Sequence, residues 1–158
     1  MDDQTLYPSA VPREVPSHAR VTTLQKAEIL RGVEIFSNTT VEELFQLASI
    51  AREADFTVGQ IIFREDDVGD ALYLLVEGEV DLTSRKEGFR ALVRPRQAFG
   101  LYSVLTREPR FLSAKALQDS FVLWIGAEDF YSLLSSNMEI VVGLFKHFVR
   151  KCSLHPGC

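Results

Sequence analysis

Two residues ten positions apart, Gly100 and Arg110, have the types and the spacing to bind a phosphate group. A glycine at the start of a helical turn lets backbone N–H groups approach an anion, and these groups have no partner within the turn. An arginine that follows clamps the same anion with the forked donors of its guanidinium. The segment 99–110 therefore predicts a phosphate cradle between two strands. It lacks the carboxylate that the sugar hydroxyl of a nucleotide would need.

This segment resembles the phosphate-binding cassette of the cyclic-nucleotide-binding domain family, which includes the catabolite activator protein and kinase regulatory subunits. Upstream, the run 59–80 resembles the family's signature of strand, Gly-Asp turn, strand, glycine and strand, with the turn at Gly69-Asp70 and the glycine at Gly78. The matching segments extend over residues 24–151. The resemblance implies a mainly β fold: a jelly-roll barrel with two N-terminal and two C-terminal helices. In that family the last helix moves as a lid over the bound base and transmits the signal.

The resemblance also implies which residues would contact a ligand. It predicts that one hydrogen bond to the sugar is lost. Gly100 and Arg110 match the family's glycine and phosphate-binding arginine, whereas Leu101 stands where the family has a glutamate that accepts the ribose hydroxyl. Leucine accepts no hydrogen bond, and a buried hydroxyl without a partner costs about 1–3 kcal/mol. Tyr102 and Ser103 take the places of a hydrophobic and a small residue.

After the arginine the family has two small residues followed by Thr or Ser. Here the corresponding residues are Phe111, Leu112 and Ser113. The two bulky side chains stand where the backbone would contact the phosphate, and Ser113 keeps a hydroxyl that would orient a base. Arg110 has a second reading, in which it pairs with an acidic loop residue such as Asp66 or Asp67 and binds no ligand.

The hydrophobic pattern predicts which elements position these residues. A short helix is expected over 23–31, and Thr40 with Glu43 forms a capping box that opens a second helix. The pattern then predicts strands, separated by glycines, over 52–57, 60–64, 71–77, 79–84, 89–94, 112–117 and 121–125. Helices are expected over 128–135 and from an N-cap at Asn137. Within strand 121–125, Trp124 is expected to lie in the core.

The chain of 158 residues suits one domain. Residues 1–22, with Pro8, Pro12 and Pro16, predict a flexible tail or linker; 23–151 form the domain and 152–158 a C-terminal tail. The N-terminus is acidic and shows no signal peptide, and the apolar run 140–145 is too short to cross a bilayer. We therefore expect a cytoplasmic domain that inserts in no membrane.

The formal net charge of −5 argues against nucleic-acid binding by this domain. The charge is uneven, because the segment 85–115 holds eight basic and two acidic residues. A basic surface here would raise the local concentration of a phosphate ligand. Alternatively, these are solvated charges on the faces of strands.

Other chemistries find little support in the sequence. The three histidines, His18, His147 and His155, are scattered and lie at no metal-ligand spacing. Neither a Gly-x-Ser-x-Gly elbow nor a glycine-rich nucleotide loop of the Walker type occurs. We expect no metal, no cofactor and no catalysis.

Three hypotheses follow. The first is a regulatory module of this fold whose nucleotide affinity is weak or lost and which acts through its C-terminal helices on a larger protein or partner. The second is a working cyclic AMP or cyclic GMP sensor, or a sensor of another small anion, that binds phosphate through Gly100 and Arg110. The third is a truncated transcriptional regulator whose DNA-binding domain is missing.

The last helix bears on the first hypothesis because it has a wide apolar face. That face could be core, a lid, or a seam with a partner domain or a second copy, and core is the default expectation. Its residues are Ile140, Val141, Leu144, Phe145 and Phe148.

Overall fold

A computed structural model describes residues 20–153. Helices come first and last in the chain, and the strands lie between them. The helical elements are α1 (Thr23–Arg31), η2 (Glu34–Phe36), α2 (Val41–Ile50), α3 (Leu101–Thr106), α4 (Ala127–Ser136) and α5 (Met138–Ser153). The strands are β1 (Arg52–Phe56), β2 (Ile61–Phe63), β3 (Ala71–Glu77), β4 (Val80–Ser84), β5 (Phe89–Val93), β6 (Ala98–Phe99), β7 (Ser113–Ala116) and β8 (Ser120–Gly126).

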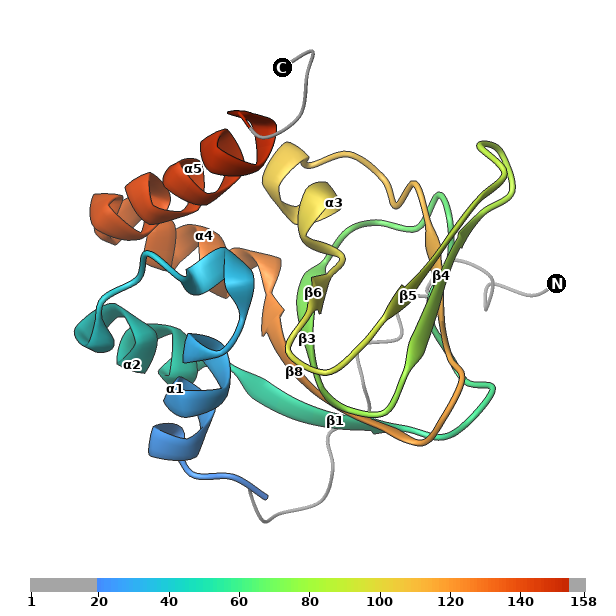
Figure 1. The fold of residues 1–158 in the computed structure, drawn as a ribbon, viewed down its shortest axis with the longest axis horizontal. Helices are drawn as coiled ribbons and strands as arrows, with labels where there is room; N and C mark the ends of the chain where they lie inside the picture. Colours follow the sequence, from blue (N-terminus) through green and yellow to red (C-terminus); the bar gives the residue numbers. More distant parts are fainter. Residues whose placement is uncertain (1–19, 154–158) are drawn as a thin grey trace, which may run out of the picture.

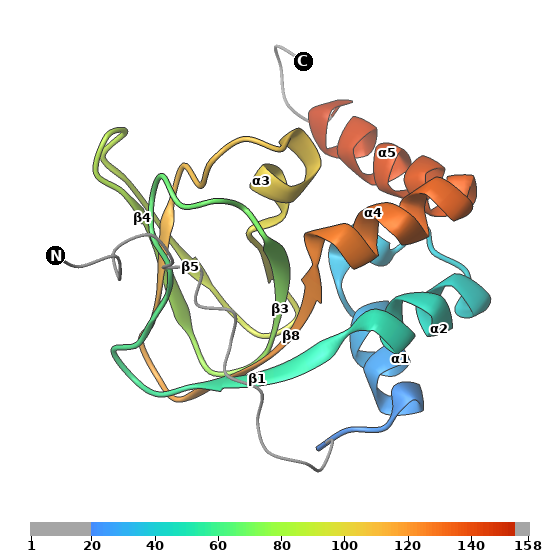
Figure 2. The same ribbon diagram turned by 180° about the vertical axis from the view of Figure 1, so that it is seen from behind.

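The strands form two four-stranded antiparallel sheets, in the orders β1-β8-β3-β6 and β2-β7-β4-β5 (Figure 1). The expected fold class, mainly β with flanking helices, is confirmed, although the two sheets do not close into a continuous barrel. The long helices α1, α2, α4 and α5 gather on one side of the β-domain, beside the first sheet (Figures 1 and 2). Within the described residues, none of these four helices packs on the second sheet.

Side-chain alternation along the central strands divides the core into two layers. On β8, Phe121, Leu123 and Ile125 pack with the helices, whereas Val122 and Trp124 face the space between the sheets. Strand β3 alternates in the same way. Because both faces of these strands are buried, their sequences read as nearly continuous apolar runs. Trp124 lies in the core as expected.

Local sequence signals fix the helix starts. Thr40 and Glu43 form the expected capping box: Glu43 N–H donates to Thr40 Oγ1 over 3.3 Å, and Thr40 N–H donates to Glu43 Oε2 over 2.8 Å. Thr22 and Gln25 form a second box at the start of α1, which the sequence reading missed. None of the helices within residues 20–153 is long and apolar enough to cross a membrane.

The element bounds agree with the sequence expectations to within one or two residues, apart from two short elements. The missed elements are η2 and β6, which are too short to leave a periodic pattern. Helix α5 runs to Ser153, beyond the expected domain end at 151. The rest of the expected C-terminal tail, and all but the last three residues of the expected linker, lie outside the described residues.

Helix α5 packs differently from the default expectation. Ile140 and Leu144 are buried in the core, as expected. Phe145, however, is 66% exposed and Phe148 is 41% exposed, so the expectation that they are core residues was wrong. The helix thus has two apolar faces: one packs on η2 and α4, and the other is exposed.

Candidate ligand-binding site

The cassette is a short helix, and the residues before and after it both have a left-handed backbone conformation. Strand β6 pairs with β3 through Phe99 and Tyr73, and Gly100 then takes a φ of +76° and starts α3. Glycine adopts this conformation without steric cost, which explains its place at the turn. Arg107 ends the helix with a φ of +60°, and the chain returns through Pro109 to Arg110.

Arg110 points into the core beneath the cassette. Its side chain is 1% exposed. Nη1 donates to the carbonyl of Gly100 over 2.6 Å, and Nη2 donates to the carbonyl of Ala71 over 2.5 Å. The guanidinium carbon lies 4.1 Å from the centre of the Phe63 ring, in cation–π contact. Main-chain acceptors and an aromatic ring therefore hold the group that was expected to clamp a phosphate.

The ion-pair partner of Arg110 is Asp70, rather than Asp66 or Asp67. Nη2 lies 3.8 Å from Asp70 Oδ1. Asp66 and Asp67 contact Arg110 through the backbone only: Asp66 N–H donates to the Arg110 carbonyl over 2.7 Å, and Arg110 N–H donates to the Asp67 carbonyl over 2.8 Å. The expected pairing with an acidic loop residue is therefore present, but through Asp70 at the end of that loop rather than through Asp66 or Asp67.

Burial controls the electrostatics around this arginine. Desolvation lowers the pKa of Arg110 from its ordinary value, and electrostatic interactions with Tyr73, Asp70 and Asp67 oppose that effect. An arginine remains protonated at neutral pH even so, because its ordinary pKa is above 12. Desolvation also raises the pKa of the neighbouring Tyr73, which is buried between the sheets. Arg110 Nε has no hydrogen-bond partner among the described residues.

A cavity of about 200 Å³ opens beside the cassette, between α3 and the second sheet. Its walls bring together seven of the eight residues expected at the site: Gly100, Leu101, Tyr102, Ser103, Arg110, Phe111 and Leu112. The other lining residues are Phe63, Leu82, Ala98 and Phe99, which are all apolar. The structure thus assembles the expected positions around one space, and that space is small and mostly hydrocarbon.

Tyr102 and Ser113 already have hydrogen-bond partners within the domain. Tyr102 donates its hydroxyl to Glu108 over 2.7 Å, and its ring meets that of Phe111 edge to face at 4.9 Å. Ser113 lies outside the cavity, and its Oγ accepts the backbone N–H of Glu65 over 2.9 Å. Ser103 is buried beneath Gly69. A Cβ on that glycine would lie 2.3 Å from the Ser103 Cβ, which explains why glycine stands there.

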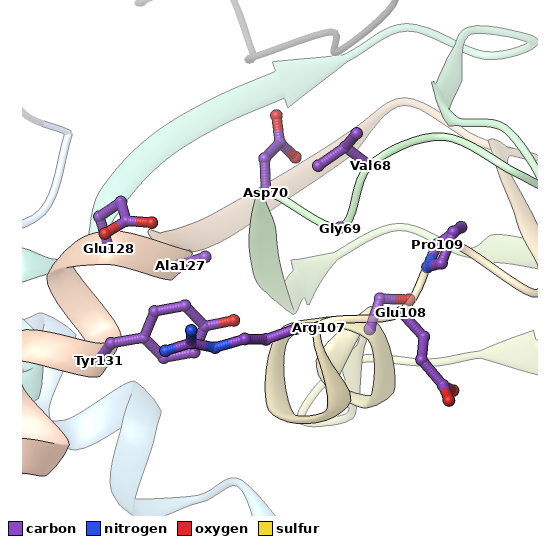
Figure 3. Close-up of a pocket in the computed structure, with 10 residues that line it drawn as sticks. Val68, Gly69, Asp70, Arg107, Glu108, Pro109, Ala127, Glu128 and Tyr131 are labelled. Carbon is purple, nitrogen blue, oxygen red and sulfur yellow. The ribbon is translucent and has the colours of Figure 1, made fainter.

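A second cavity of about 350 Å³ lies where α3, α4 and the loop before β3 meet (Figure 3). Asp70 and Glu128 stand along it, and the Arg107 guanidinium lies 4.6 Å from the Tyr131 ring centre, across the ring. Tyr131 donates its hydroxyl to the carbonyl of Val104 and so ties α4 to α3. The carboxylates disfavour an anion here, so this cavity offers no substitute for the phosphate cradle.

The sequence reading missed three residues that shape the site: Asp70, Phe63 and Tyr131. Asp70 belongs to the Gly-Asp turn, but its pairing with Arg110 spans forty residues and leaves no local pattern. Its carbonyl also accepts the N–H of Ala127 over 2.8 Å, at the start of α4. No group of three or more His, Cys, Asp or Glu side chains within residues 20–153 could hold a metal ion.

Comparison with known proteins places this geometry in context. A family model described as "Cyclic nucleotide-binding domain" matches residues 53–137. The "Cyclic AMP receptor protein" of Thermus thermophilus is 31% identical over 109 residues, which are 66% of this chain and 50% of that protein. The chain thus spans about half the length of this curated relative.

Solved structures have the same fold. The N-terminal domain of a transcriptional regulator from Streptomyces coelicolor A3(2) aligns with a TM-score of 0.69 and 27% identity, over 79% of this chain and 92% of that one. The regulatory domain of Toxoplasma gondii PKA with cAMP aligns with a TM-score of 0.70 and 21% identity, over 84% and 50% of the two chains. Because the family model matches more than half of the sequence, the chain belongs to the cyclic nucleotide-binding domain family.

Proposed function

We propose that this domain is a regulatory, non-enzymatic module of the cyclic nucleotide-binding fold whose affinity for cyclic nucleotides is weak or lost. The observation that carries the proposal is the placement of Arg110. Two main-chain carbonyls already occupy its terminal nitrogens, and its side chain is almost completely sealed from solvent. The remaining N–H donors of the guanidinium, including Nε–H, are buried with the rest of the side chain, so a phosphate could reach them only if the side chain moved.

The dimensions of the inner cavity support the same proposal. Cavities that hold small molecules usually measure about 300–1,000 Å³, whereas this one measures about 200 Å³. Leu101, Phe111 and Leu112 line it at the positions where the family has a glutamate and two small residues. The glutamate's hydrogen bond to the ribose has no equivalent at Leu101. The loss of one such bond is worth a factor of about 10–100 in affinity.

Calorimetric titration with cyclic AMP and cyclic GMP tests the proposal. We expect no heat of binding up to millimolar nucleotide for the natural sequence. The triple variant Leu101→Glu/Phe111→Ala/Leu112→Ala is expected to gain at least tenfold in affinity, because it restores the acceptor and removes two bulky side chains from the cavity.

A matched control is Leu105→Glu, which adds the same charge to α3 outside the inner cavity. It should gain no nucleotide affinity. Micromolar binding by the natural sequence, lost in Arg110→Lys while the fold is kept, would instead establish the alternative of a working sensor.

We further infer that the domain acts through the outer face of α5. Met138, Val142 and Phe145 are exposed on this face at intervals of four and three residues, and Phe148 lies beside them. Apolar residues repeating at this spacing are typical of a helix that pairs with another helix. The same spacing on two copies of the chain is self-complementary, which favours pairing of α5 with a second copy over pairing with a different domain.

Analytical ultracentrifugation tests this pairing. We expect the chain to sediment as a dimer at tens of micromolar and the variant Val142→Ser/Phe145→Ser to sediment as a monomer. Leu92→Ser is the control, because Leu92 is about as exposed as Val142 but belongs to β5, a strand of the second sheet on the other side of the β-domain from α5 (Figure 1). A natural sequence that stays monomeric throughout would overturn self-pairing.

A further inference from the structure

The outer face of the second sheet carries a hollow of about 590 Å³. The strands that line it lie on the side of the β-domain away from the long helices (Figures 1 and 2). Three separate segments form the hollow: the end of β2 with the loop that follows, the end of β4 with its hairpin, and β7. Its lining residues are Ile61, Arg64, Glu65, Asp66, Thr83, Arg85, Lys86, Ser113, Ala114 and Lys115. It is distinct from the cavity beside the cassette.

Hydrogen bonds that involve Glu65 join the three segments around this hollow. The Glu65 carboxylate accepts the Ser84 hydroxyl over 2.8 Å and the Arg85 N–H over 3.2 Å, and the Glu65 N–H donates to Ser113 Oγ over 2.9 Å. The Ser84 hydrogen bond holds the pKa of Glu65 below its ordinary value, so this residue is ionised at neutral pH. The three segments are therefore joined, and the hollow does not depend on a loose loop.

The charges of the hollow are unbalanced. Asp66 already pairs with Lys86, whose Nζ lies 2.7 Å from Asp66 Oδ1, and the Glu65 carboxylate accepts the hydrogen bonds described above. Arg64, Arg85 and Lys115 form no ion pair with any residue in the described range 20–153. Asp81 faces Lys115 across the strands, but its carboxylate pairs with Arg90 at 2.8 Å. The lining thus holds four cations and two carboxylates, a local charge of +2 in a chain whose net charge is −5, and three of the cations form no ion pair within the described range.

We propose that this hollow docks an acidic peptide segment of a partner protein. Its cations come from three different segments and are all exposed, so they suit carboxylates spread along an extended chain. A compact phosphate site would instead need buried donors that converge on one point. Thr83 and Ser113 lie opposite each other between the cations, and Ile61 adds an apolar contact. An acidic peptide supplies carboxylates for the cations, backbone groups for the hydroxyls of Thr83 and Ser113, and apolar atoms for Ile61.

Fluorescence anisotropy with a labelled octaglutamate peptide tests the proposal. In 50 mM NaCl we expect saturable binding that weakens at least tenfold in the variant Arg85→Glu/Lys115→Glu. Binding should also weaken as salt is raised to 300 mM, because exposed charges are screened. Backbone NMR signals of Thr83, Ser113 and Lys115 should shift on titration in the natural sequence.

The control variant is Lys146→Glu/Arg150→Glu, which makes the same change in net charge on exposed positions of α5. It should bind octaglutamate like the natural sequence. Equal weakening in both variants would show attraction to net charge alone and overturn the docking site, as would failure of the natural sequence to bind. Tighter binding of inorganic tripolyphosphate than of octaglutamate, dependent on Arg85 and Lys115, would overturn the peptide assignment. Thermal melts of all variants establish that each is folded.

Discussion

Replacing Arg110 with alanine is expected to lower the free energy of unfolding by about 2–4 kcal/mol. The change strands the buried carbonyls of Gly100 and Ala71, which now accept hydrogen bonds from the guanidinium. Each unsatisfied buried group costs about 1–3 kcal/mol, and the space left by the side chain adds to the loss. Relief from burying a charge offsets part of it.

Urea denaturation followed through the fluorescence of Trp124 measures this change, because this single tryptophan is buried between the sheets. Arg64→Ala is the matched control, since Arg64 is exposed near the end of β2 and an exposed substitution usually changes stability by less than about 0.5 kcal/mol. An Arg110→Ala variant as stable as Arg64→Ala would show that the arginine does not support the fold. The weak-affinity proposal would then lose its main structural reason.

Gly100→Ala is expected to lower the free energy of unfolding by about 2–4 kcal/mol, for a reason the sequence alone does not supply. The residue has a φ of +76°, which disfavours alanine. In addition, a Cβ would stand 2.8 Å from Arg110 Nη1 and 3.3 Å from Phe63 Cε1. The methyl group would therefore push on the buried guanidinium and its aromatic neighbour.

Gly88→Ala separates the two causes. Gly88 also has a positive φ, of +62°, but a Cβ there would meet nothing within 4 Å. The free energy of unfolding of Gly88→Ala should fall only by the conformational cost of a positive φ, about 1–2 kcal/mol. Equal losses at the two positions in the same urea experiment would show that the space around Arg110 adapts easily. Combining Gly100→Ala with Arg110→Ala should cost less than the sum of the single changes, because both act on one contact.

The strands were predictable because both layers of the core leave a strong pattern along the chain. In β8 every residue from Phe121 to Ile125 is apolar, and the structure buries all of them. The helix start at Thr40 was predictable because its cap lies within three residues of sequence. Strand β6 was missed because two residues form no period, and its pairing with β3 depends on residues far away in the chain.

The candidate site was predictable as a set of positions but not as a chemical environment. Seven of the eight residues expected from the motif line one cavity, and Ser113 alone lies outside it. No local signal shows that Arg110 turns inward to two carbonyls and Asp70. Its direction depends on the aromatic ring of Phe63 and on the turn before β3, which packing brings together.

The sequence by itself therefore determined the family and the order of the elements, because periodicity, caps and motif positions are properties of neighbouring residues. Only the tertiary structure decided that Arg110 is sealed, that Phe145 faces outward and that the cations near β2, β4 and β7 share one hollow. These features arise from contacts between segments distant in the chain. Their energies depend on burial and on the direction of each side chain, which a linear pattern does not contain.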